Sequence, residues 1–133
     1  MTEIKECNFK ELSLTEQEQC LELIKYLDVD IKKTVEILQD VCSTCYLIIK
    51  NKVVVAFCCM NSIVLRFIRV NKDYRNDKLC RLLITYVNIH HNEYLLYTKN
   101  PALIHIYNNS KIQYDVISDL SNQKVNRIHY KKQ

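Results

Sequence analysis

The chain has 133 residues, of which 48% are hydrophobic and 26% charged, and its net charge is +4. This composition argues against disorder, and the length predicts a single domain spanning residues 1–133. The longest apolar run, Val53 to Met60, is much shorter than the ~20 residues of a membrane helix, and the polar N-terminus has no signal-peptide segment. No basic stripe interleaved with aromatic residues supports nucleic-acid binding. We therefore expect a cytoplasmic protein without a membrane or nucleic-acid partner.

Glycine and tryptophan are absent, and there is one proline. Average chains contain about 7% glycine. Because glycine, alanine and proline codons are rich in G and C, this bias indicates an AT-rich genome and says nothing about activity. It also means that Asn and Asp must supply the turns that need a positive φ.

The N-terminal third predicts a strand followed by two helices. Loose alternation over Glu3 to Phe9 indicates the strand. Ser13 to Leu27 predicts a helix that opens with a capping box made by Thr15 and Glu18, and Asp30 predicts the N-cap of the second helix. The apolar residues that recur at helical spacing in these helices are Cys20, Leu23, Ile24 and Leu27, then Ile31, Val35, Leu38 and Cys42.

The middle of the chain predicts three antiparallel strands. Cys45 to Ile49, Val53 to Met60 and Ile63 to Val70 are β-branched, aromatic and apolar runs. The turns at 50–52 and 60–62 are too short for anything but hairpins, and Asn51 suits the left-handed position of the first.

A strand end, a polar turn and a helix follow. The turn covers Asp73 to Lys78, and the helix runs to His90 with an apolar stripe of Leu79, Leu82, Leu83, Tyr86 and Val87. A strand that enters a helix in this way directs several unpaired backbone N–H groups to one point. With the positive end of the helix dipole, those groups predict an anion site, most naturally for phosphate.

The C-terminal part predicts a strand, a helix and two more strands. Tyr94 to Tyr97 forms the strand, and Asn100 caps a helix with Pro101 at its first position, which fades near Ser110. The last strands are predicted at Tyr114 to Ile117 and at Val125 to Tyr130. The order β-α-α-β-β-β-α-β-α-β-β indicates a mixed α/β architecture with one parallel crossover.

Seven cysteines without an export signal are expected to be reduced thiols. Cys42 and Cys45 form a C-x-x-C pair, but a structural zinc site needs a second such pair, so packing is the better interpretation and no metal is predicted.

In this element order, two segments resemble the GCN5-related N-acetyltransferase (GNAT) superfamily. The family's first motif, close to V-x-x-x-Y-R-G-x-G-[IV]-G-x-x-L-[LI], is matched in register by Val70, Tyr74, Arg75, Leu79 and Leu83. The second, similar to N-P-A-A-I-x-L-Y-E-K-L-G-F, is matched by Asn100, Pro101, Ala102, Ile104 and Tyr107. The resemblance implies an α/β fold with a GNAT-like mixed sheet of about six to seven strands flanked by four helices.

The resemblance also implies an acetyl-CoA site. Its cofactor-binding residues would be Ile68, Val70, Arg75, Asn76, Asp77, Lys78, Leu79, Cys80 and Asn100. The family's motif glycines and its small residue fall on Asn76, Lys78 and Cys80, and a later glycine falls on Lys111. Lys78 could reach a phosphate oxygen or could fill the cofactor's place. We favour binding, because residues of a first helical turn need no positive φ.

For catalysis, the resemblance implies that backbone N–H groups around Ile68 to Val70 polarise the thioester and that Tyr107 protonates the leaving thiolate. The alternative for Tyr107 is simple packing. The preceding strand has no carboxylate, so we assign no general base. Alternation predicts that Arg66 and Arg69 face opposite sides of the sheet. Arg66 either pairs with a helix carboxylate or binds a carboxylate or phosphate of the acceptor.

The resemblance therefore implies an acetyl-CoA-dependent N-acetyltransferase acting on a primary amine. Because many relatives are dimers, it also raises a homodimer as an expectation. The alternative is a catalytically inactive GNAT-fold binding or interaction module, which the altered motif positions and the missing base favour. The acceptor stays open among small amines, polyamines, aminosugars and protein termini.

Overall fold

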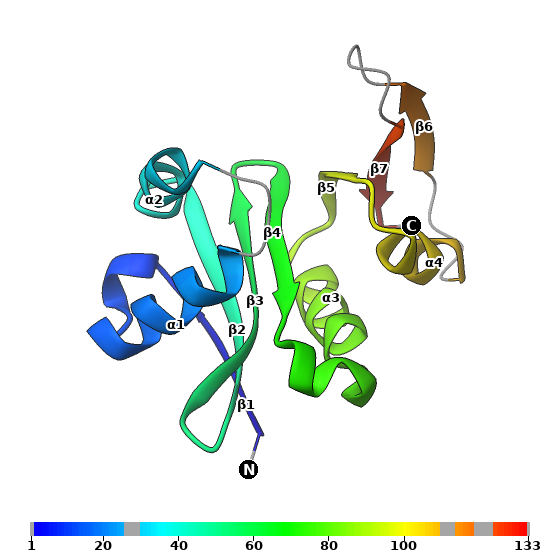
Figure 1. The fold of residues 1–133 in the computed structure, drawn as a ribbon. Coiled ribbons are helices and arrows are strands. Elements are labelled where there is room, and N and C mark those ends of the chain that lie inside the picture. The colour runs from blue at the N-terminus through cyan, green and yellow to red at the C-terminus, as the bar shows by residue number, and fades with distance from the viewer. Residues whose placement is uncertain (1, 26–29, 110–113, 119–123, 133) are drawn as a thin grey trace.

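The computed structural model describes residues 2–25, 30–109, 114–118 and 124–132. Within them lie seven strands, four α-helices and two 3-10 helices (Figure 1). In chain order these are β1 (Thr2–Cys7), η1 (Phe9–Glu11), α1 (Leu14–Ile24), α2 (Ile31–Leu38), β2 (Ser43–Lys50), β3 (Val53–Asn61), β4 (Val64–Val70), η2 (Lys72–Asp77), α3 (Leu79–His90), β5 (Glu93–Thr98), α4 (Pro101–Asn109), β6 (Tyr114–Ser118) and β7 (Lys124–Lys131). The predicted element order and fold class are confirmed.

The strands form one mixed sheet in the order β1-β2-β3-β4-β5-β7-β6. Only β4 and β5 pair in parallel, and α3 makes the predicted crossover between them. Helices α1 and α2 lie on one face of the sheet, and α3 and α4 lie on the other (Figure 1). Each face has its own core: Phe57, Leu23 and Leu38 pack on the first, whereas Leu83 and Tyr94 pack on the second.

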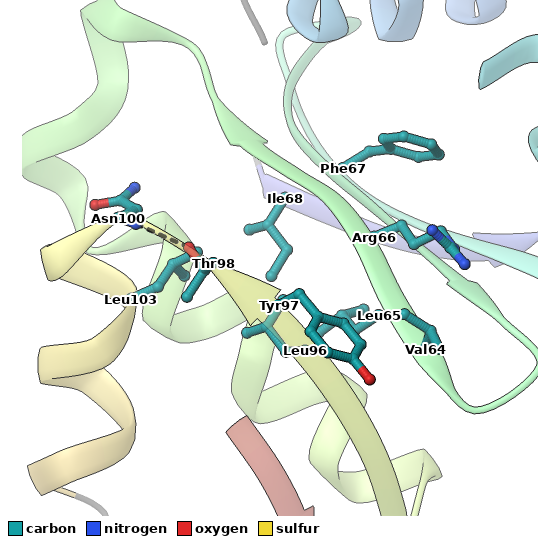
Figure 2. Close-up of a pocket in the computed structure, with 10 residues that line it drawn as sticks. All are labelled: Val64, Leu65, Arg66, Phe67, Ile68, Leu96, Tyr97, Thr98, Asn100 and Leu103. Carbon is teal, nitrogen blue, oxygen red and sulfur yellow. Dashed lines mark hydrogen bonds between the residues drawn. The ribbon is translucent and has the colours of Figure 1, made fainter. Parts of the chain in front are cut away.

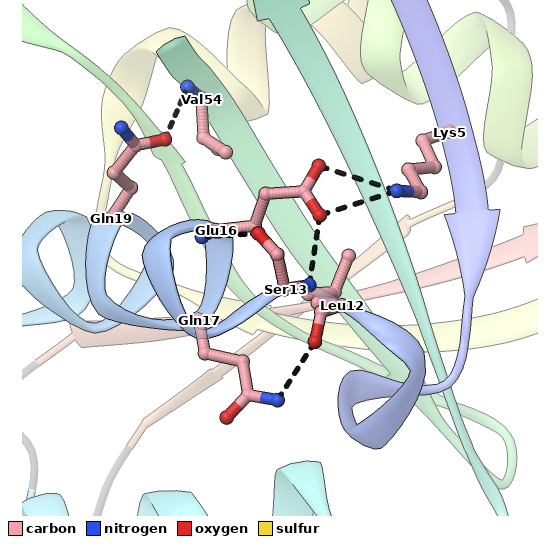
Figure 3. A network of polar contacts seen from close by, with 7 residues as sticks. All are labelled: Lys5, Leu12, Ser13, Glu16, Gln17, Gln19 and Val54. Carbon is pink, nitrogen blue, oxygen red and sulfur yellow. Dashed lines mark hydrogen bonds and ion pairs between the residues drawn. The ribbon is translucent and has the colours of Figure 1, made fainter. Parts of the chain in front are cut away.

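The start of α1 differs from the prediction. Ser13, not Thr15, is the N-cap, and its side chain accepts a hydrogen bond from the Glu16 N–H while Glu16 accepts one from the Ser13 N–H (Figure 3). Both pairs have capping-box spacing. The earlier one prevails because Lys5 of β1 also binds the Glu16 carboxylate, with 3.2 Å between Nζ and each oxygen. Further along α1, the Gln19 side chain accepts a hydrogen bond from the Val54 N–H of β3.

Two cysteine predictions have different outcomes. Helix α2 ends at Leu38, so Cys42 is not part of its apolar stripe and is exposed, which makes that prediction wrong. Cys45 is fully buried in the core under α1, as the packing interpretation predicts. Leu27, which was predicted to end the apolar stripe of the first helix, lies outside the described residues. Asn51 takes the predicted left-handed conformation, with φ 51°.

None of the described helices combines the length and the apolar character that a membrane-spanning helix requires.

Candidate active site

The two parallel strands at the centre of the sheet separate. Val64 pairs with Leu95, and Leu65 pairs with Leu96; past these, no described residue of β5 pairs with β4. A cavity of about 260 Å³ opens where the strands part, and Ile68, Asn100 and Leu103 contribute to its wall (Figure 2). Main-chain groups of β4 on that side therefore face the cavity instead of a neighbouring strand.

A second cavity, of about 300 Å³, continues from the first toward the N-terminus of α3. The two share Ile68, Asn100 and Leu103. Arg75 and Cys80 line the second cavity only. Together they form one elongated hollow, which we call the β4 groove, and it runs from the start of α3 to the gap between β4 and β5.

The α3 end of the groove is suited to an anion. The N-cap residue of α3, Lys78, makes no side-chain cap hydrogen bond, so the first-turn N–H groups are not capped by it. The positive end of the helix dipole lies at the same place. Arg75 also lines this cavity, and a guanidinium group binds phosphate oxygens well. Burial raises the pKa of the Cys80 thiol to about 11, so Cys80 contributes a neutral wall.

The backbone at Lys78 differs from the expectation that this position needs no positive φ. Its backbone is left-handed, with φ 59° and ψ 27°, so this position does use a positive φ. A glycine would adopt this conformation without strain, whereas a residue with a Cβ does so at a cost. The lysine side chain is exposed and lines neither cavity. The lysine thus takes over the conformation of a glycine and leaves the groove open.

We expect the Lys78→Gly variant to be more stable than Lys78→Ala by about 1 kcal/mol, because only glycine removes the left-handed strain. Urea denaturation of both variants measures the difference. The matched control is Glu18, which is exposed in the interior of α1. There the order should reverse, since glycine in a helix interior is about 1 kcal/mol worse than alanine. If the glycine variant is the more stable, or the less stable, at both positions, the proposed backbone strain at Lys78 is contradicted.

The two strand arginines face the same side of the sheet, so the prediction of opposite faces is wrong. Arg69 lies opposite Phe57 and Arg66 lies opposite Cys59, with a register shift between the two pairs. The extra residue is accommodated by a bulge at Phe67, whose φ is 59°. Because Phe57 and Cys59 both belong to the core under α1 and α2, Arg66 and Arg69 point toward that face.

Tyr107 belongs to α4, is fully buried and lines neither cavity. Its hydroxyl lies 2.6 Å from that of Tyr94, which donates a 2.6 Å hydrogen bond to Asn88 Oδ1. Because the Tyr94 proton is used on Asn88, Tyr107 donates to Tyr94 in this arrangement. Burial raises the pKa of both tyrosines, so both stay protonated. The role of Tyr107 as a proton donor stays a prediction.

The structure brings most of the predicted site residues to the groove. Those that line it are Arg66, Ile68, Val70, Arg75, Cys80 and Asn100. Asn100 also caps α4 as predicted, with its Oδ1 accepting from the Ala102 N–H at 2.9 Å. Leu79 is buried in the core instead. Asn76 and Asp77 lie in η2, but their side chains are outside what the structure describes.

Several lining residues were not predicted from the sequence. Ala102 and Ile106 lie one turn apart on α4, which is a signal that helical spacing could have supplied. Tyr97 and Thr98 end β5, where ligands bind at the carboxyl ends of parallel strands. Arg69 was predicted only to face away from Arg66, whereas it lies on the same side of the sheet.

The sheet, its opening and the groove define an α/β domain shaped to hold an elongated ligand with an anionic end. The sequence matches no family model and no curated protein. Solved structures do match: an acyl-CoA N-acyltransferase from Pseudomonas aeruginosa is 12% identical with a TM-score of 0.76, covering 96% of this chain and 99% of that one. The ribosomal-protein-S18-alanine N-acetyltransferase from Escherichia coli is 15% identical with a TM-score of 0.76, covering 98% and 93%.

A GNAT-family acetyltransferase from Staphylococcus aureus Mu50 is 17% identical with a TM-score of 0.68, covering 97% of this chain and 99% of that one. Similarity of this kind establishes the architecture. The chain has the GNAT fold, and the low identities agree with the divergence of its motifs.

Proposed function

We propose that the protein transfers an acetyl group from acetyl-CoA to a primary amine. The observation that carries this proposal is the β4 groove, which joins an electropositive helix start to a gap between parallel strands. An elongated thioester with a diphosphate at one end matches the groove in charge and in shape.

Different residues along the groove would bind different parts of acetyl-CoA. Arg75 and the first-turn N–H groups of α3 would hold the diphosphate. The apolar walls at Ile68, Leu103 and Ile106 would pack against the arm that links the diphosphate to the thioester. Acetyl-CoA supplies the activated acyl group, and unpaired main-chain N–H groups of β4 near Ile68 would stabilise the negative charge that develops on its carbonyl oxygen.

In the transfer, the amine nitrogen forms a bond to the acetyl carbon, the carbon–sulfur bond breaks, and the amine gives up a proton to solvent water. We propose that Tyr107 returns a proton to the departing thiolate. To do so its hydroxyl must exchange the hydrogen bond to Tyr94 for one to the sulfur. The seven cysteines are free thiols in the structure, which supports our proposal of a reducing, cytoplasmic location. A homodimer stays a prediction.

A second candidate is a module that binds an acyl-CoA without turning it over. One observation favours it: the Tyr107 hydroxyl is fully buried and already donates to Tyr94. The two candidates predict the same binding and different chemistry.

We expect acetyl-CoA at 100 times its dissociation constant to raise the free energy of unfolding by about 2.7 kcal/mol. Melting with and without acetyl-CoA measures this effect, and mass spectrometry of an amine mixture measures acetylation. Pantetheine, which lacks the nucleotide and its diphosphate, should stabilise much less at equal concentration. Stabilisation without any acetylated product would support the binding module. A clear melting transition that acetyl-CoA does not move would contradict both candidates.

A further inference from the structure

The gap between β4 and β5 opens on both faces of the sheet. Leu65, Leu96 and Leu103 line it from the face covered by α3 and α4, where they belong to the core on that side. Phe67 lines it from the opposite face and packs against the core under α1. Since the cofactor end of the groove lies beside α3 and α4, an acceptor has the α1 and α2 face left to approach from.

An arginine and two aromatic residues of that second face line the gap: Arg66 and Phe67 extend from β4, and Tyr97 extends from β5 (Figure 2). Arg66 and Phe67 share the face because of the bulge in β4. Tyr97 alternates with the buried Leu96, so it points the same way, and it is 47% exposed. We call Arg66, Phe67 and Tyr97 the acceptor mouth.

Arg66 has unused binding capacity. Its Nε is buried, and within the described part of the chain it has no hydrogen-bond partner. A buried donor of a charged group is costly to leave unsatisfied, and a guanidinium binds carboxylate and phosphate oxygens in pairs. Such a group at the wall of a cavity is positioned for an anion that arrives with a ligand.

The charged and titratable neighbours of the mouth come from three strands. Cys59 of β3 lies opposite Arg66, and Arg127 of β7 lies opposite Tyr97. His129, two residues further along β7, contacts the Glu93 carboxylate at 2.6 Å. The hydrogen bond from Cys45, that from Ser43 and the charge of Arg66 lower the pKa of the Cys59 thiol, against the effect of its burial. Cys59 is therefore the neighbour whose influence on Arg66 has to be tested separately.

We propose that the acceptor is a small amine that also carries an anionic oxygen group, a carboxylate or a phosphate, which Arg66 binds while the amine reaches the thioester. This inference rests on the proposed function and specifies its substrate class. It excludes polyamines, which carry only positive charge. The aromatic rings of Phe67 and Tyr97 would flank the short carbon chain between the two groups.

The test uses pairs of amines matched in size. β-Alanine is paired with propylamine for the carboxylate, and 2-aminoethyl phosphate is paired with ethanolamine for the phosphate. Initial rates of acetylation are measured by mass spectrometry for the wild type and for Arg66→Gln. We expect the wild type to prefer the anionic member of at least one pair by roughly tenfold or more in kcat/KM. Arg66→Gln should lose that preference and keep its KM for acetyl-CoA.

Three further variants separate binding by Arg66 from a structural effect. Arg66→Lys keeps the charge and should retain part of the preference. Cys59→Ala removes the thiol that lies opposite Arg66, and Lys33→Gln removes an exposed charge on α2. Both variants should retain the preference in full. If Cys59→Ala loses the preference as well, the proposal is overturned. Arg66 would then affect acceptor choice through the packing of the core and not by binding the anionic group.

Melting provides a readout that does not depend on turnover. With CoA present, β-alanine or 2-aminoethyl phosphate should stabilise the wild type more than its neutral partner does, and Arg66→Gln should abolish the difference. If CoA binds and both members of each pair behave alike, the proposal for the acceptor is wrong and the proposed function stands. If acetyl-CoA itself has no effect on melting, the proposed function fails, and the acceptor proposal falls with it.

Discussion

Replacing Tyr107 with phenylalanine should lower kcat by about 100-fold or more, the range that a positioned general acid contributes. The phenyl ring keeps the packing of a side chain that is fully buried, while the proton donor is lost. The hydrogen bond to Tyr94 is lost as well, which should lower the free energy of unfolding by only about 1 kcal/mol. Initial rates of amine acetylation and urea denaturation measure the two effects separately.

The matched control is Tyr94→Phe. It removes the same hydroxyl–hydroxyl hydrogen bond, and also the bond to Asn88, but it leaves the Tyr107 hydroxyl in place. We expect its kcat to stay within a few-fold of the wild type. Equal losses of kcat in the two variants would show that Tyr107 acts by packing, and they would favour the binding module.

The pH dependence offers an independent check on Tyr107. Burial raises the pKa of this hydroxyl above the ordinary tyrosine value of ~10. A group whose pKa is raised stays protonated to higher pH, so the proton donor should not be lost as pH rises to ~10. A fall of kcat below that pH must therefore come from another group or from unfolding.

The regular elements could be predicted because their signals are local. The stripe from Leu79 to Val87 has one period over more than two turns, and α3 follows it to His90. The hairpin contains Asn51, and asparagine accepts a left-handed backbone more easily than most residues other than glycine. Asn51 and Lys52 both take a positive φ. Asn100 followed by Pro101 likewise marks the start of α4.

The bulge at Phe67 could not be predicted in this way. A bulge inserts one residue into one strand of a pair, and only the partner strand reveals the insertion. Glycine often marks such positions, but this chain contains none. Strict alternation through the bulge therefore predicts opposite faces for Arg66 and Arg69, which in fact share one face.

Lys78 and Tyr107 illustrate two other limits. The sequence places Lys78 at the end of the turn before α3, and it does lie there. Its left-handed backbone depends on how η2 meets α3, which side-chain type alone does not disclose. Helical spacing placed Tyr107 on the same face as Leu103, yet its burial depends on Tyr94, a residue from another element. Positions on an element follow from local sequence, whereas the depth of a side chain follows from packing.

Replacing Ala102 with tryptophan should abolish acetyl-CoA binding and leave the fold intact. Ala102 is exposed in the first turn of α4 and lines the groove beside Arg75 and Cys80. An indole at this position would occupy the space between the helix and β4 without entering the core. The stabilisation by acetyl-CoA, about 2.7 kcal/mol at 100 times the dissociation constant, should therefore fall to nearly zero in a melting experiment, which corresponds to a loss of affinity of roughly 100-fold or more.

Two variants control for this result. Ala102→Ser changes the same position with little added volume and should bind acetyl-CoA as the wild type does. His105→Trp adds an indole to an exposed position on the same helix that lines neither cavity, so binding should persist. If Ala102→Trp keeps the full stabilisation, the ligand does not lie in the β4 groove. If Ala102→Trp and His105→Trp both lose it, the effect comes from disturbing α4, and the groove has not been blocked selectively.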